Sequence, residues 1–85
     1  DINYIIGGVK VISYKNLGGN SNVLSYEIGL TYIDVKFGDG SIYRYSNQSA
    51  GINNVNQMKI LAEKGVGLNS FIMRNCKTKY EFKTR

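Results

Sequence analysis

The chain has 85 residues, of which 42% are hydrophobic, and a formal net charge of +5. A chain of this length forms one small domain, because a second hydrophobic core would need more residues. Histidine is absent and Cys76 is the only cysteine. This excludes an internal disulfide, a zinc site built from Cys and His, and a Cys–His catalytic dyad. We therefore expect neither a cofactor nor enzymatic activity.

Targeting signals are not visible in the sequence. No hydrophobic run reaches the roughly 18 residues of a membrane-spanning helix, and no charged start followed by an apolar stretch resembles a signal peptide. We expect a cytoplasmic protein that does not contact a membrane.

Glycine, asparagine and aspartate must supply the turns, because the chain contains no proline. Gly7-Gly8 separates two strand-like runs, residues 4–6 and 9–12, and such a pair accepts the positive φ angles of a tight hairpin turn. The sequence therefore predicts an N-terminal β-hairpin. Residues 16–22 are rich in Asn, Ser and Gly and predict a loop after it.

The clearest strand covers residues 33–37, where apolar and polar side chains alternate. Such alternation places one set of side chains against a core and the other set in water. The inward set is Ile33, Val35 and Phe37.

The preceding strand is expected to join it through a two-residue turn at Gly29-Leu30. This register sets Tyr26 opposite Ile33 and Leu24 opposite Val35, so that both earlier side chains face the core.

The following strand is expected to join through a three-residue loop at residues 38–40, whose last glycine is left-handed. Tyr43 then lies opposite Val35 and Tyr45 opposite Ile33, whereas a two-residue turn would point an arginine into the core. The outer face of the three strands carries Ser25, Glu27, Tyr32, Asp34, Lys36, Ile42 and Arg44.

Two helices follow. The first is predicted over residues 54–64, with a capping box formed by Asn54 and Gln57 and an end at Gly65. The second is predicted from about residue 69 to residue 77. Their packing sides comprise Val55, Met58, Leu61 and Ala62 in the first helix, and Phe71, Ile72 and Cys76 in the second.

The end of the chain alternates again, with Tyr80 and Phe82 between charged residues, and predicts an extended segment attached to the body. Together these elements predict a single α+β domain. An antiparallel three-stranded meander, which the N-terminal hairpin could extend, is covered on one face by two short helices.

A series of short motifs runs over residues 21–82. They are Ser21-Asn22-Val23, the hairpin from Val35 to Ile42, Tyr43-Arg44-Tyr45, Ala62-Glu63-Lys64-Gly65, Asn69, Ile72-Met73-Arg74 and Tyr80. In this order and spacing they resemble the KTSC family. That family is a short domain named after the C-terminus of some lysyl-tRNA synthetases, and it also occurs alone in bacterial and phage proteins. The resemblance implies RNA binding and brings no catalytic residues.

With this resemblance the chain divides into three segments. Residues 1–20 form an N-terminal hairpin and a glycine-rich loop, residues 21–82 a KTSC-like domain, and residues 83–85 a basic C-terminal tail.

Positive charge is concentrated at the end of the chain. Five of the 11 Lys and Arg residues lie in the last 12 residues, where Glu81 is the only acidic residue. Clustered cations are what phosphate binding requires, and aromatic rings between them can stack on bases. We therefore expect a nucleic-acid-binding segment made of Arg74, Lys77, Lys79, Lys83 and Arg85. The alternative is a solvated tail that Tyr80 and Phe82 anchor to the core.

The outer face of the sheet offers a second, weaker group of contacts. Lys36, Arg44 and Tyr32 could approach phosphates there, although Asp34 lies across from Arg44 and favours an ordinary cross-strand ion pair. Tyr43 and Tyr45 form a Tyr-x-Tyr motif that we predict to face the core and not to serve as an exposed stacking platform.

Cys76 has basic neighbours that could lower its pKa, but a small buried core residue is the stronger prediction. The leading function is then a non-catalytic contact with nucleic acid, RNA in particular, made by a monomer or homodimer. The rival is a protein-interaction module, such as a phage-encoded inhibitor of a host nuclease or defence complex, whose partner would be a host protein.

Overall fold

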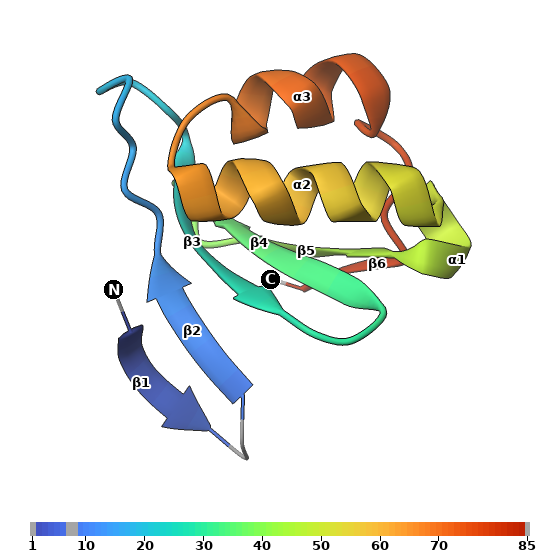
Figure 1. The fold of residues 1–85 in the computed structure, drawn as a ribbon, viewed down its shortest axis with the longest axis horizontal. Coiled ribbons are helices and arrows are strands. Elements are labelled where there is room, and N and C mark those ends of the chain that lie inside the picture. The colour runs from blue at the N-terminus through green and yellow to red at the C-terminus, as the bar shows by residue number, and fades with distance from the viewer. Residues whose placement is uncertain (1, 7–8, 85) are drawn as a thin grey trace.

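The computed structural model describes residues 2–6 and 9–84. Within these ranges the chain forms six strands and three helices (Figure 1). In chain order they are β1 (Ile2–Ile6), β2 (Val9–Ser13), β3 (Val23–Ile28), β4 (Tyr32–Phe37), β5 (Ile42–Ser46), α1 (Asn47–Ala50), α2 (Ile52–Lys64), α3 (Leu68–Asn75) and β6 (Phe82–Thr84).

The strands form a single antiparallel sheet in the order β1-β2-β3-β4-β5-β6. Helices α2 and α3 lie on one side of this sheet, and α1 makes the connection at the end of β5 (Figure 1). The protein is therefore an α+β domain, as predicted. The N-terminal hairpin does extend the meander, and the predicted extended tail adds β6 at the other edge, beside β5. The turn predicted at Gly7-Gly8 lies outside the described residues.

No described helix is long and apolar enough to cross a bilayer.

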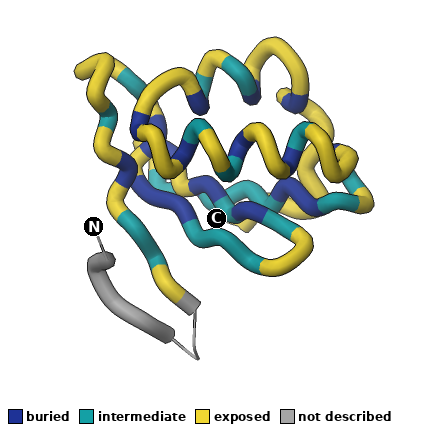
Figure 2. Tube along the Cα trace, viewed as in Figure 1, coloured by how far each residue is buried: buried dark blue, intermediate teal, exposed yellow. Residues whose placement is uncertain are grey.

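Buried residues of the sheet and of the helices form one hydrophobic core. Figure 2 shows them as dark segments in the strands and along α2 and α3. Both predicted helical stripes contribute to this core, although Leu61 and Phe71 are only partly buried. The side chains that are fully buried are Tyr45, Ile33, Met58, Leu68, Ile72, Val35, Val55 and Cys76.

The predicted register between β4 and β5 is confirmed. Tyr43 pairs with Val35 and Tyr45 with Ile33. The connecting loop contains Gly40 in the left-handed region, at φ 88°, and its N–H donates to the Phe37 carbonyl at 2.9 Å. A glycine adopts this conformation without steric cost, so this loop fixes which face of β5 meets the core.

The predicted turn at Gly29-Leu30 is wrong. The Gly29 N–H donates to the Tyr32 carbonyl at 2.9 Å, so the turn lies one residue later and Tyr26 pairs with Val35. Two contacts hold this turn. Within it, the Tyr32 ring covers Gly29, where any side chain would collide with the ring, and from α2 Lys59 Nζ donates to the Gly29 carbonyl at 2.9 Å. The shift of the pairing by two residues keeps Tyr26 on the inner face, where it is buried as predicted.

Leu24 does not face the core, in contrast to the prediction. The β3–β4 register shifts between Val23 and Ser25, which leaves Leu24 as an extra residue that is 49% exposed. A bulge of this kind changes the inside-outside alternation by one position. Val23 therefore takes the inward place, next to Phe37.

The predicted start of the first helix, with a capping box at Asn54 and Gln57, is wrong. Ser46 and Ser49 form the capping box, with the Ser49 N–H donating to Ser46 Oγ and the Ser46 N–H donating to Ser49 Oγ, both at 3.0 Å. The short helix α1 follows this cap, and α2 starts at Ile52 and not at residue 54. Asn54 instead donates from its side-chain amide to the Ala50 carbonyl. The predicted end is correct, since Gly65 is left-handed and caps α2.

The second predicted helix is confirmed as α3, which starts at Leu68 and ends at Asn75, two residues before the predicted end. No side chain of its own first turn caps this helix. The hydroxyl of Tyr14, which is buried after β2, instead accepts a hydrogen bond from the Leu68 N–H at 3.3 Å. In the same segment the Leu17 N–H donates to the Gly65 carbonyl at 2.8 Å. The segment after β2, at Tyr14 and Leu17, is thus hydrogen-bonded to the junction between α2 and α3.

Gly65 should tolerate substitution poorly, because a close contact and a positive φ coincide there. A Cβ there would come within 2.6 Å of Lys15 Cβ, at a φ of +81°, where an alanine costs about 1–2 kcal/mol from conformation alone. We expect Gly65→Ala to lower the free energy of unfolding by about 2 kcal/mol or more, measured by urea denaturation.

Gly18→Ala is the matched control, because no heavy atom lies within 4 Å of its Cβ position. Its effect should stay within about 0.5 kcal/mol. Equal midpoints for the two variants would contradict the role given to Gly65.

Candidate functional site

A pocket of about 450 Å³ opens where the β4–β5 hairpin, the end of α3 and the segment before β6 meet. Its lining combines aromatic rings with polar side chains, one lysine and one carboxylate, that of Asp39. We call it the aromatic pocket, and its lining residues are Asn22, Phe37, Asp39, Tyr43, Tyr45, Asn69, Met73, Lys77, Thr78 and Tyr80.

Tyr43 is the centre of the aromatic cluster. The Phe37 ring meets it edge-on at 5.4 Å between centroids, and the Tyr80 ring does so at 4.9 Å. The Tyr45 ring lies nearly parallel to it, at 6.3 Å and 14°. Edge-to-face and offset contacts of this kind are favourable ring arrangements, so the pocket wall is fixed by ring contacts from three separate segments.

Exposure decreases in steps across this cluster. Tyr80 is 39% exposed, Tyr43 is half-buried, and Tyr45 is 1% exposed. The prediction that the Tyr-x-Tyr motif faces the core is thus confirmed, with Tyr43 at the boundary between core and pocket. Burial is the main reason that the pKa of the Tyr45 hydroxyl is raised far above its usual value, so this group stays neutral.

This raised pKa predicts a loss of stability in alkali. Above pH 10 a tyrosine in the unfolded chain releases its proton, while Tyr45 in the folded chain retains it. The free energy of unfolding is therefore not reduced by this group below pH 10, and it decreases as the pH rises above 10. Burial also raises the pKa of Tyr26 and Tyr32, so the effect is shared. Denaturation series between about pH 9 and pH 11 should show a smaller decrease for Tyr45→Phe than for the natural chain. Identical slopes would contradict the assignment to Tyr45.

One lysine lines the aromatic pocket, and two more lie near it in the fold or in the sequence. Lys83 lies opposite Tyr43 in the β5–β6 pairing, and its Nζ is 5.3 Å from the centroid of the Tyr43 ring. Lys77 is part of the lining, and Lys79 follows two residues later on the same connection. All three are exposed, and within residues 2–6 and 9–84 no carboxylate forms a salt bridge with them. Their charges therefore face solvent at the pocket.

The other face of the sheet holds a neutralised arginine. Arg44 donates to both carboxylate oxygens of Asp34, from Nε at 2.8 Å and from Nη2 at 2.9 Å. Its guanidinium also lies 3.7 Å from the Tyr32 ring centroid and 5.0 Å from the Phe82 ring centroid. The hydrogen bond to Asp34 is the main reason that the pKa of Arg44 is raised. The guanidinium of Arg44 is therefore already bound by side chains of the sheet.

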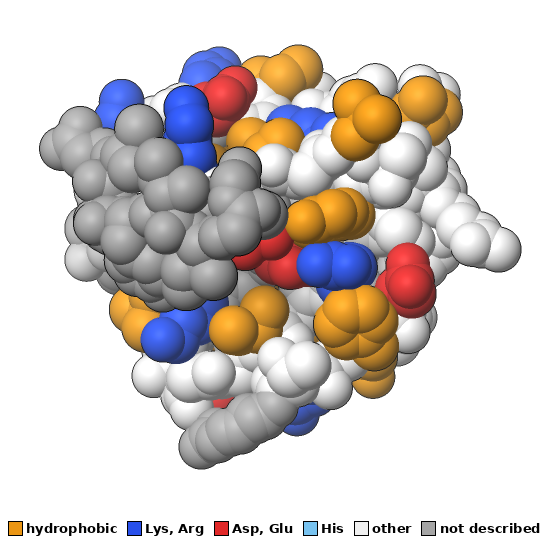
Figure 3. Space-filling model, turned by 90° about the horizontal axis from the view of Figure 1, so that it is seen from below, with side chains coloured by type: hydrophobic (Ala, Val, Ile, Leu, Met, Phe, Trp, Pro, Cys, Tyr) orange, Lys and Arg blue, Asp and Glu red, His pale blue; other side chains and the backbone are white. Residues whose placement is uncertain are grey.

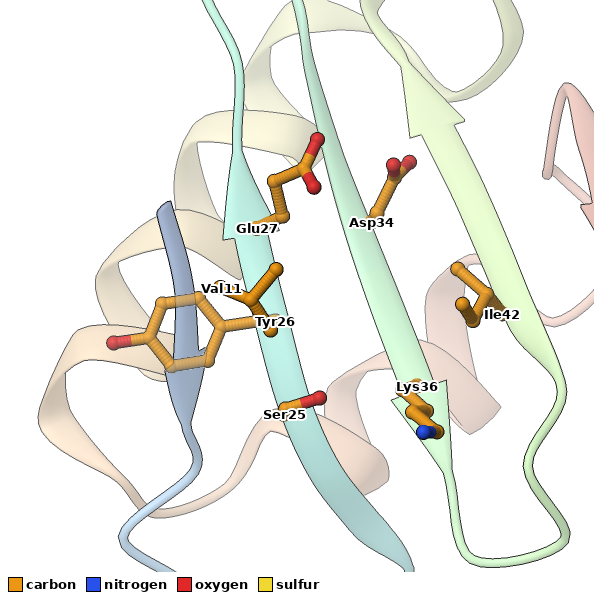
Figure 4. Close-up of a pocket in the computed structure, with 7 residues that line it drawn as sticks. All are labelled: Val11, Ser25, Tyr26, Glu27, Asp34, Lys36 and Ile42. Carbon is orange, nitrogen blue, oxygen red and sulfur yellow. The ribbon is translucent and has the colours of Figure 1, made fainter. Parts of the chain in front are cut away.

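Acidic groups continue along this uncovered face. Figure 3 shows it with acidic and basic side chains next to each other in its centre. Tyr32 donates its hydroxyl to Glu27 at 2.9 Å, which contributes, after burial, to the raised pKa of Tyr32. Lys36 lies on the same face, at a pocket of about 250 Å³ that Glu27 and Asp34 also line (Figure 4). The carboxylates oppose the binding of phosphates here.

The predicted contact residues therefore separate into groups. The structure brings Lys77 and Lys83 together at the aromatic pocket, with Lys79 on the adjoining connection. Arg74 lies exposed in the last turn of α3. The opposite face of the sheet carries Lys36, Arg44 and Tyr32, and Arg85 lies outside the described residues.

The sequence analysis includes Asn22 and Asn69 among the KTSC-like motifs but does not predict that they line a pocket. Asn22 reaches it because the Gly38 N–H donates to the Asn22 carbonyl at 2.8 Å, which joins the loop before β3 to the β4–β5 hairpin. Asn69 comes from α3, and Thr78 from the connection that follows. These residues are distant in sequence, so their meeting at one pocket follows from the fold and from no local signal.

The cysteine belongs to the core. Cys76 is fully buried, as predicted, and burial raises the pKa of its thiol despite the opposing charge of Lys79. A protonated thiol without solvent access is a poor nucleophile. In the described part of the chain, no group of three or more Cys, Asp and Glu side chains is arranged to hold a metal ion.

The sequence matches no family model, no curated protein and no solved structure. The resemblance to the KTSC family stays a prediction.

Proposed function

We propose that this protein is a non-catalytic module that binds single-stranded nucleic acid, RNA in particular, at the aromatic pocket. The main support is a pocket that Lys77 and the exposed ring of Tyr80 line, with Lys83 Nζ 5.3 Å from the centroid of the Tyr43 ring in the same wall. Binding of single strands generally combines a cationic surface for the phosphates with aromatic rings for the bases. Both parts occur here side by side.

Single strands fit this site better than duplexes do. In a duplex the bases cover one another and leave only their edges accessible in the grooves. In a single strand the faces of the bases can reach aromatic side chains. The preference for RNA over DNA comes from the resemblance to the KTSC family, since the pocket chemistry suits both.

The proposed binding surface does not include the uncovered face of the sheet. Arg44 is engaged by Asp34 there, and Glu27 adds a further negative charge. Phosphates would gain little binding free energy from Arg44 and Lys36 on this face, because both cations lie beside carboxylates.

A titration at several salt concentrations tests the proposal. Fluorescence anisotropy of a labelled single-stranded RNA of about ten nucleotides should report binding that weakens steeply from about 50 mM to about 200 mM salt. The logarithm of the association constant should fall against the logarithm of the salt concentration with a slope of about −2, as expected for three phosphate contacts on a single strand. The same sequence as a duplex should bind more weakly.

The absence of salt-dependent binding to single-stranded RNA and DNA would overturn the proposal. If in that case a host protein is retained on the immobilised chain after nuclease treatment, the rival role as a protein-interaction module would replace it.

A further inference from the structure

We propose that the aromatic pocket holds one unstacked nucleobase, while the phosphates on either side of it contact Lys77 and Lys83. This inference rests on the proposed binding of single strands and adds a base-dependent contribution to it. A purely electrostatic surface would bind phosphates with no such contribution.

The volume and lining of the pocket suit a flat heterocycle. About 450 Å³ lies within the range of roughly 300–1,000 Å³ that is usual for sites that bind small organic groups. Such sites combine apolar surface with polar groups that set the orientation of the ligand. Here Phe37, Tyr43 and Tyr80 supply the apolar part, and Asn69 and Thr78 are among the polar groups.

The geometry of the rings provides a stacking surface and a side wall. The planes of Tyr80 and Tyr43 are 81° apart, at a centroid distance of 4.9 Å. A base that stacks on one ring therefore meets the second ring approximately at right angles. Tyr43 is held by its contacts with Phe37 and Tyr45, so little ordering of the wall is needed when the base enters.

The polar groups can contact the edge of the base. Asparagine amides offer a donor and an acceptor side by side, a pattern that complements base edges. Asn22 and Asn69 both line the pocket, from the loop before β3 and from α3. A base in the pocket would thus stack on a ring and present its edge to an amide.

The cations lie where the adjoining phosphates would be. Lys83 Nζ stands 5.3 Å from the Tyr43 ring centroid, and Lys77 lines the same pocket from the connection after α3. A base held against these rings would bring its flanking phosphates toward these two exposed cations. The pocket on the uncovered face has two carboxylates, Glu27 and Asp34, beside its one lysine, Lys36 (Figure 4). In the aromatic pocket Asp39 is the one carboxylate beside Lys77, and Lys83 adds a second positive charge at the Tyr43 ring.

A ligand without a base provides the first test. Two oligonucleotides of equal length are compared, one natural and one with a single abasic position, so that the number of phosphates is the same. Moving the abasic position along the strand should reveal one place where affinity falls about fivefold or more, the effect of losing one stacked base. At the same place 2-aminopurine should lose fluorescence on binding, as it does when it stacks.

Variants of the protein provide the second test. Tyr80→Leu removes the exposed ring and should lower affinity for the natural strand by about fivefold or more, with no change in the salt slope. Tyr80→Phe keeps the ring and should bind as the natural chain does. Phe82→Leu is the matched control, because Phe82 is also 39% exposed but contacts Arg44 on the opposite face.

The outcomes separate the two proposals. If affinity depends on salt but neither the abasic position nor Tyr80→Leu changes it, the base pocket is wrong and the electrostatic function stands. If Tyr80→Leu and Phe82→Leu weaken binding equally, the pocket assignment is wrong as well. If no strand binds at any salt concentration, both proposals fail.

Discussion

Exchange of Lys77, Lys79 and Lys83 together for glutamine should weaken binding of a single-stranded oligonucleotide on the order of a hundredfold at about 50 mM salt. Each lysine that neutralises a phosphate releases a counterion, and this gain is largest at low salt. The three side chains are exposed and have no described acidic partner, so their charges are available for this role. The salt slope of the variant should be smaller by about 2.

A second triple variant is the control for this loss of charge. Lys10, Lys15 and Lys64 are also exposed but lie on β2, on the loop after it and at the end of α2. Their exchange for glutamine lowers the net charge by the same amount and should reduce affinity only weakly. Equal losses in both triple variants would show that total charge matters and its position does not, contrary to the proposed surface.

Replacement of Tyr14 by alanine should lower the free energy of unfolding by about 3–5 kcal/mol, which is a large part of the roughly 5–15 kcal/mol of a small domain. Tyr14 is 7% exposed and belongs to the hydrophobic core. Its hydroxyl also accepts the Leu68 N–H at the start of α3. The variant therefore creates a cavity and leaves a buried donor unpaired, and a chemical denaturation curve measures the sum.

Tyr14→Phe separates the two contributions. It keeps the ring but removes the acceptor, which should cost about 1–3 kcal/mol. Leu17→Ala in the same segment is the control, because that side chain is 68% exposed and should contribute less than about 0.5 kcal/mol. An alanine at position 14 with no greater effect than at position 17 would mean that the N-terminal segment is not part of the core.

The parts of the fold that sequence could predict are those fixed by local chemistry. The loop ending at Gly40 dictates the β4–β5 register, because one residue with positive φ determines which face of β5 turns inward. Gly65 ends α2 for a similar reason. The β3–β4 turn depends instead on Tyr32 packing over Gly29 and on Lys59 reaching it from α2. The contact from Lys59, 30 residues away, has no local sequence signal.

The same division applies to the candidate site. The cluster of lysines near the chain end is visible in the sequence, and so is the inward phase of Tyr43 and Tyr45. The pocket itself is not visible, because it forms where Asn22, Asn69 and Tyr80 meet from three separate segments. The number of basic residues alone does not show which charges can bind phosphate. The charge of Arg44 is neutralised by its hydrogen bonds to Asp34, which the sequence alone does not establish.

The most direct test of the proposed binding surface is a residue-by-residue NMR titration of the ¹⁵N-labelled chain with a short single-stranded RNA. We expect the backbone signals of Asn69, Lys77, Thr78 and Tyr80 to shift together and to saturate at one concentration, because these residues surround the aromatic pocket. Signals of the uncovered face, such as that of Glu27, should stay in place. Shifts centred on that face, with the signals at the pocket unchanged, would contradict the account.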